Sequence, residues 1–153
     1  MKYFLLISLF SLIPFLGINA QGNNSANKSD KRSELMAKYM EEKKSYLKQC
    51  IPLNDSEAEK FFALYDELEK KKFEIMLPIH KESRKIRKST DPVSDEAYSA
   101  VADKLAELPV KIATIESEYF AKFKQILSPK QMFMFFNCEN SFGKSILKKE
   151  QNK

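Results

Sequence analysis

The feature that most constrains the fold is the spacing of apolar residues, which recur every three or four positions from about residue 30 to residue 147. On an α-helix this spacing gathers apolar side chains on one face, and charged residues fill the remaining positions. The 153 residues include only 3 Gly. Scarce glycine argues against tight hairpins, β-rich architecture and phosphate-binding loops. The chain is therefore predicted to be all-α.

Interruptions in this spacing predict four helices and place their ends. The first helix is expected over about residues 30–48, because Pro52 disfavours helix in the residue before it. The second is expected over about residues 53–88. Pro78 lies inside its periodic pattern, so we expect a kink there rather than an end. A turn is expected at residues 89–92, Ser-Thr-Asp-Pro.

The third helix is expected from a cap at Ser94 to about Ile126, with apolar residues at near-heptad spacing that suit packing along a partner helix. Pro109 predicts a second kink. The fourth helix is expected from residue 127 into a Lys-rich tail. Helices two and three should form a long antiparallel hairpin that cannot bury all its apolar residues alone. Helices one and four are expected to cover part of it, and a second copy more, which predicts a homodimer.

One helix-opening motif occurs twice. Each copy is a Leu, a capping residue, two free positions and then Glu or Gln. The cap side chain accepts a hydrogen bond from the backbone three residues on, and the Glu or Gln reaches back to the backbone N–H of the cap. Capping boxes are common, so either copy alone is a weak signal. The residues are Leu53, Asn54 and Glu57 in the first copy and Leu127, Ser128 and Gln131 in the second.

The first twenty residues have the layout of a secretory signal peptide. Lys2 precedes an apolar run that ends at small Ala20, where cleavage is expected. The alternative is a membrane anchor, but a spanning helix needs ~20 apolar residues and this run is shorter. We expect a periplasmic protein without stable membrane insertion. Residues 21–30 are expected to be a flexible tail, residues 31–149 a single helical domain, and residues 150–153 a frayed C-terminus.

The repeated motif and the four-helix pattern resemble the Spy/CpxP family of periplasmic proteins, whose mark is a twice-occurring Leu-Thr-x-x-Gln motif. Residues 59–68 and 119–131 are also similar to the small Bacteroidetes homologues. The chain departs from the motif where Asn54 and Ser128 replace Thr and Glu57 replaces Gln, although all three keep the capping chemistry. The resemblance implies a curved helical dimer whose concave face holds unfolded proteins without ATP. Other relatives sense envelope stress or metals and signal to a membrane partner, including sigma-factor systems.

No motif in the sequence points to catalysis. The single histidine, His80, is expected to be a structural residue, and no triad-like arrangement is supported. A metal site needs several converging ligands, which the sequence does not offer, so no metal or other cofactor is expected. The net charge of +5 comes from interspersed charges of both signs, which is typical of a solvated helical surface rather than a nucleic-acid interface.

The two cysteines, Cys50 and Cys138, are an even pair in a chain expected to reach an oxidising compartment. The hairpin returns the start of the fourth helix toward Cys50. A bridge needs Cα atoms within ~7 Å, so the fourth helix must cross near the end of the first. An intramolecular disulfide, two buried free thiols and an intermolecular bond all remain open.

The leading functional prediction is ATP-independent chaperoning of unfolded or stressed envelope proteins. Met and Phe suit varied clients because they repack easily, and basic residues attract acidic segments. The alternative is a periplasmic sensor that acts through one specific membrane partner, and a structural adaptor is a third class. The candidate binding residues are Phe62, Met76, Arg84, Lys85, Met132, Phe133, Met134, Phe135 and Phe136. The last five are consecutive, so one helix cannot bury them all on one side.

Overall fold

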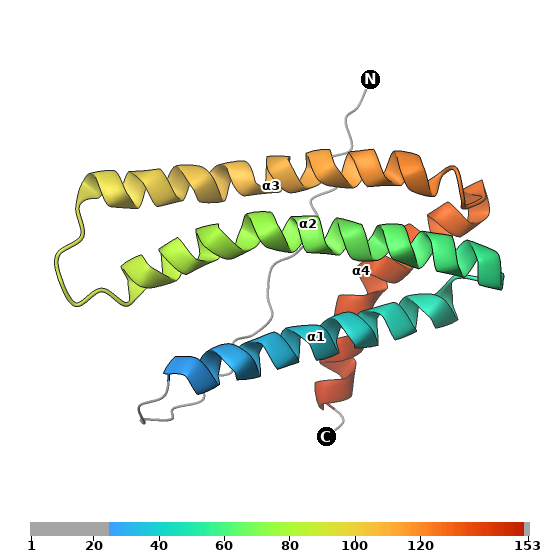
Figure 1. Cartoon of the computed structure of the whole chain (residues 1–153), viewed down its shortest axis with the longest axis horizontal. Helices are drawn as coiled ribbons and strands as arrows, with labels where there is room; N and C mark the ends of the chain where they lie inside the picture. The colour runs from blue at the N-terminus through green and yellow to red at the C-terminus, as the bar shows by residue number, and fades with distance from the viewer. Residues whose placement is uncertain (1–24, 152–153) are drawn as a thin grey trace. The chain divides into compact units, whose positions relative to one another are not determined.

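The computed structural model describes residues 25–151 and contains four α-helices (Figure 1). They are α1 (Ser25–Cys50), α2 (Asp55–Arg87), α3 (Asp95–Phe123) and α4 (Pro129–Gln151). No strand occurs among the described residues, and the predicted all-α fold class is confirmed. The predicted signal peptide and residues 21–24 of the predicted tail lie outside the described residues, as do residues 152–153.

Three helix ends differ from the prediction. Residues 25–30, assigned above to a flexible tail, are the start of α1, because no Gly or Pro interrupts residues 25–50. Similarly, α4 extends to Gln151, into the segment expected to fray. The third helix ends at Phe123 rather than Ile126. Its backbone closes a tight turn there, in which the N–H of Leu127 donates to the carbonyl of Phe123 at 2.7 Å.

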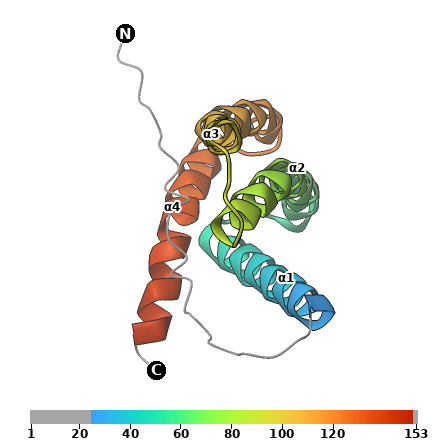
Figure 2. The same ribbon diagram turned by 90° about the vertical axis from the view of Figure 1, so that its left-hand side faces the viewer.

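The chain divides into two units, residues 1–36 and residues 37–153, and the packing below is that of the second. In this unit α2 and α3 form an antiparallel hairpin joined by residues 88–94. The part of α1 that belongs to it lies beside α2 and antiparallel to it, and α4 crosses one side of these three helices (Figures 1 and 2). Pro78 and Pro109 both lie inside continuous helices, so neither ends its helix.

Aromatic side chains fill the core, which lies where α1 and α4 meet one end of the hairpin. Phe61 of α2 is fully buried, and its ring centre lies 4.9 Å from that of Phe123 in α3 and 5.4 Å from that of Phe135 in α4. Leu47 of α1 is also fully buried and belongs to the same cluster. Burial of several large aromatic side chains, each removing ~150–250 Å² from water, is the main force that joins the four helices here.

Candidate binding surface

Both capping boxes are present, and the two contact each other. The backbone N–H of Glu57 donates to Asn54 Oδ1 at 2.9 Å, and that of Asn54 donates to Glu57 Oε2 at 3.0 Å. In the second box the Ser128 N–H donates to Gln131 Oε1 at 2.8 Å, and the Gln131 N–H donates to Ser128 Oγ at 3.3 Å. Gln131 Nε2 then donates to Glu57 Oε2 at 3.0 Å and to the Pro52 carbonyl at 2.9 Å. The motif therefore joins the starts of α2 and α4.

The leucines of the motif have a packing role. Leu127 is buried in the core, and partly buried Leu53 packs against it. Apolar contact just before a helix cap fixes the angle at which the chain enters the helix. All six motif residues thus position helices, and none of their contacts indicates a binding site.

A disulfide between Cys50 and Cys138 joins the end of α1 to α4. The two residues are 88 positions apart in sequence, and their Cα atoms are 6.2 Å apart. This is the intramolecular bond among the three alternatives that the sequence left open. Since Cys138 is buried in the core, the bond anchors the middle of α4 against the last turn of α1.

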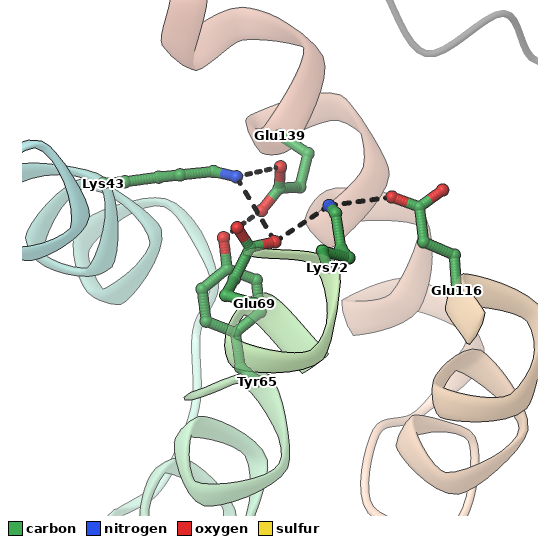
Figure 3. A network of polar contacts seen from close by, with 6 residues as sticks. All are labelled: Lys43, Tyr65, Glu69, Lys72, Glu116 and Glu139. Carbon is green, nitrogen blue, oxygen red and sulfur yellow. Dashed lines mark hydrogen bonds and ion pairs between the residues drawn. The ribbon is translucent and has the colours of Figure 1, made fainter. Parts of the chain in front are cut away.

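Charged side chains beside the aromatic core form a network that joins all four helices (Figure 3). Lys43 of α1 is only 4% exposed, and its Nζ lies 2.9 Å from Glu139 Oε2 in α4 and 3.9 Å from Glu69 Oε1 in α2. The hydroxyl of Tyr65 donates to Glu139 Oε1 at 2.6 Å. Glu139 is therefore the residue through which α4 enters the network.

Lys72 of α2 continues the network toward α3. Its Nζ lies 2.9 Å from both Glu69 Oε1 and Glu116 Oε1. Burial alone would lower the pKa of Lys72, but the two carboxylates outweigh burial and raise it above its ordinary value. Burial of Tyr65, followed by the charges of Glu139 and Glu69, raises the pKa of its hydroxyl well above 10.0. Both groups are held in their protonated forms.

The nine candidate binding residues fall into three groups by exposure. Phe62, Met132 and Phe135 are buried, so the structure does not present them to a partner. Helical periodicity turns them toward the same core as Phe61 and Cys138. Phe133 lies on the opposite side of α4 and is 68% exposed. Lys85 is exposed, and the remaining four are half-buried: Met76, Arg84, Met134 and Phe136.

The half of the hairpin that lies beyond the Lys72–Glu116 pair from the aromatic core, called the distal half below, has fewer buried side chains. Two ion pairs set its register: Lys72 with Glu116 at 2.9 Å, and Lys104 with Glu82 at 2.6 Å. Beyond the first pair, the buried apolar side chains are Ile79 and Leu108 alone, among the residues whose burial is described. Other apolar side chains here stay at least partly exposed. We call nine of them the distal surface: Phe73, Ile75, Met76, Leu77, Ile86, Tyr98, Val101, Leu105 and Ile112. Val110 is 67% exposed but lies on the other side of α3 by helical spacing, so it is not part of this surface.

Sequence reasoning named only Met76 from this surface as a binding candidate. Leu105 is 37% exposed although it belongs to the predicted seam of the third helix. The sequence did contain one signal for this surface, which was geometric. Two helices packed only against each other bury just the residues along their line of contact, so other apolar residues must stay exposed. The charged network had no such signal, because Lys43 and Lys72 stand among other charges and resemble surface residues in the sequence.

Other chemistry has little support in the described part of the chain. His80 is exposed on α2. Within residues 25–151, no group of three or more His, Cys, Asp or Glu side chains is placed to hold a metal ion. None of the helices in the same range is long and apolar enough to span a bilayer.

No protein-family model, curated protein or solved structure matches this chain. The Spy/CpxP resemblance therefore rests on the repeated motif and the helix pattern, and its functional implications are proposals.

Proposed function

We propose that this protein binds unfolded or stressed polypeptides without ATP, and that the distal surface is the binding site. The observation that carries the proposal is the set of partly exposed aliphatic, Met and aromatic side chains on the distal half of the hairpin. Large apolar side chains that stay exposed on one part of a folded protein are candidates for an interaction site.

The chemistry of the distal surface suits extended polypeptides of varied sequence. Met76 is flexible and polarisable, so it adapts to side chains of different shape. Half-buried Arg84 and exposed Lys85 have no ion-pair partner among the described residues. These two cations supply long-range attraction for acidic segments, and apolar burial then supplies affinity.

We also propose that the protein is exported, with cleavage after Ala20, and acts in the periplasm. The disulfide between Cys50 and Cys138 supports this location, because structural disulfides persist in oxidising compartments. A homodimer is part of the same proposal, since a second copy would cover some of the exposed apolar side chains. Light scattering during size-exclusion chromatography tests it, and a monomer mass at micromolar concentration would exclude a stable dimer.

The second candidate is a sensor that acts through one specific membrane partner. The disulfide and the charged network favour it, because they hold α1 and α4 in one defined arrangement, which suits a single complementary partner. A general chaperone should bind many denatured proteins weakly, whereas a sensor should ignore them and bind one domain tightly.

The deciding experiment records light scattering from several unrelated denatured proteins as they aggregate, with and without the exported protein, in the absence of reductant. We expect suppression at near-equal molar ratio. The variant Met76→Ser/Leu105→Ser should lose most of it. The matched control Val110→Ser/Ala113→Ser changes exposed residues of α3 outside the distal surface and should retain it.

Circular dichroism must show that both variants keep their helices. If the folded wild type suppresses aggregation of no client, general chaperoning is excluded and the sensor becomes the leading proposal. If both variants lose suppression equally, the activity does not reside in the distal surface.

A further inference from the structure

One face of α4 points away from the rest of its unit. Six residues at helical spacing form this face, and all are exposed: Lys130, Phe133, Asn137, Asn140, Ser141 and Lys144. Phe133 is 68% exposed. In Figure 2, α4 lies along one side of α2, α3 and the part of α1 that belongs to the same unit, so no other helix of this unit lies beyond this face. We call these six residues the outer face of α4.

The outer face carries positive charge and no negative charge. Residues 119–138 contain three Lys and no Asp or Glu, although the whole chain has 21 acidic residues among 153. The nearest acidic residue of α4, Glu139, turns inward to Lys43 at 2.9 Å and Tyr65 at 2.6 Å. Lys130 and Lys144 have no ion-pair partner among the described residues. Their charges are therefore available to an anionic partner.

The basic end of α2 differs in this respect. There Glu82 lies among the lysines and arginines, and Asp91, Asp95 and Glu96 follow in the turn and the first turn of α3. A flat anionic surface would meet these acidic groups together with the cations, so its attraction to this end would be partly offset. Among the residues whose burial is described, the outer face of α4 is thus the helix face that combines an exposed aromatic ring with lysines and lacks an acidic residue.

We propose that the outer face of α4 docks on the surface of an anionic phospholipid bilayer. The charge complementarity above is the argument for this occupant. A helix lying flat on a bilayer places an aromatic ring between headgroups and acyl chains, and lysines beside it contact lipid phosphates. The face is a convex strip ~20 Å long at 1.5 Å per residue, which fits a broad flat surface better than a small ligand.

Binding should be peripheral and reversible. Each lysine near an anionic membrane strengthens binding by about fivefold, and two lysines with one Phe give an association that salt weakens. The proposal is independent of the distal surface, which lies on the hairpin. Docking by the outer face would hold the protein near the membrane, where envelope proteins emerge.

The experiment measures cosedimentation of the exported protein with phosphatidylcholine vesicles that contain, or lack, about 30% phosphatidylglycerol. Mass spectrometry must first verify that the apolar N-terminal segment is absent, because that segment would bind lipid itself. We expect binding to the anionic vesicles only, and at least a tenfold loss between about 0.1 M and 1 M salt.

Variants then locate the site. Lys130→Gln/Lys144→Gln should weaken binding by about tenfold or more, and Phe133→Ser by several-fold. Lys81→Gln/Arg87→Gln removes the same charge from the C-terminal part of α2 and should change binding by less than about twofold. All of the substituted positions are exposed, so helix content should stay unchanged.

Three results would overturn the proposal. They are equal binding to neutral vesicles, equal losses in the two charge variants, and no binding to anionic vesicles by the folded wild type. A further outcome assigns the face to protein instead: the outer-face variants bind vesicles as wild type does but lose affinity for an acidic denatured protein.

Discussion

At the scale of single residues, the side chain of Gln131 has two roles. It closes the capping box of α4, which a carboxylate could also do, and it donates two hydrogen bonds to the start of α2, which only an amide can do. Its Oε1 accepts from the Ser128 backbone, and its Nε2 donates to Glu57 and to the Pro52 carbonyl. A glutamate would keep the first contact and lose the other two. It would also bring a second carboxylate to the carboxylate of Glu57.

We therefore predict that Gln131→Glu lowers the free energy of unfolding by ~1–3 kcal/mol at neutral pH. Urea denaturation followed by circular dichroism measures the change. The exchanged pair Glu57→Gln/Gln131→Glu restores one donor and one acceptor across the contact, so it should recover part of the loss. A double variant no more stable than the single one would refute this account of the contact.

Tyr65 and Lys72 are predicted to make the folded state less stable at alkaline pH. Both have a pKa raised in the folded state, so the folded chain keeps protons that the unfolded chain releases near pH 10. Stability from these groups is therefore complete below about pH 10 and is lost as the pH rises above it.

Urea denaturation at a series of pH values tests this prediction. We expect the free energy of unfolding to fall above about pH 10, and Tyr65→Phe to reduce that slope by up to ~1.4 kcal/mol per pH unit. Tyr98→Phe is the control, because Tyr98 is 52% exposed and should leave the slope unchanged. Equal slopes for wild type and Tyr65→Phe would show that the Tyr65 hydroxyl does not carry the effect.

At the scale of elements, α2 and α3 each contain an interior proline, and the two prolines lie at the same height along the hairpin. The ion pairs Lys72–Glu116 and Lys104–Glu82 set a register that places Pro78 opposite Pro109. Each proline removes a backbone hydrogen bond from its helix. Because the two losses coincide and the distal half has a thin core, this half should open more readily than the end that contains Phe61 and Phe123.

Hydrogen exchange resolves the two halves. We expect amides of residues 80–104 to exchange faster than those of residues 58–70 and 116–123. Pro78→Ala/Pro109→Ala should slow exchange in the distal half by about tenfold or more, since a proline inside a helix costs ~3 kcal/mol. Uniform exchange along the hairpin, or no effect of the double variant, would contradict the prediction that the prolines destabilise the distal half.

At the scale of the whole unit, α1 and α4 are attached mainly through side chains. Large rings separate them from the hairpin, and among the described helices only α2 and α3 run close together along much of their length. The disulfide and the Lys43–Glu139 pair bridge α1 and α4 directly. These two bridges involve neighbouring positions of α4, so they fix the same helical turn.

Cys50→Ala/Cys138→Ala should therefore lower the free energy of unfolding by up to ~4.5 kcal/mol, the loop-closure entropy for a bond across 88 residues. Denaturant titration of wild type with and without reductant gives the same comparison without a sequence change. The single variant Cys50→Ala, which leaves one thiol, should match the double variant. If reduction leaves the unfolding midpoint unchanged, the bond does not constrain the unfolded chain as proposed.

The sequence by itself determined the helices, because their periodicity, caps and breaks are local properties. The caps Asn54, Ser94 and Ser128, the interior Pro78 and the all-α class were all readable before any packing was known. Helix ends without a strong breaker, such as the start of α1, were not readable.

Only the tertiary structure decided which of those residues meet. It buried Phe62, Met132 and Phe135, left Phe133 exposed, and joined Cys50 to Cys138. It also gathered Lys43, Glu69, Lys72 and Glu139 beside the core from three helices. The physical reason is that a helical pattern specifies a face but not the partner or crossing point of that face, and burial and pairing depend on the crossing point.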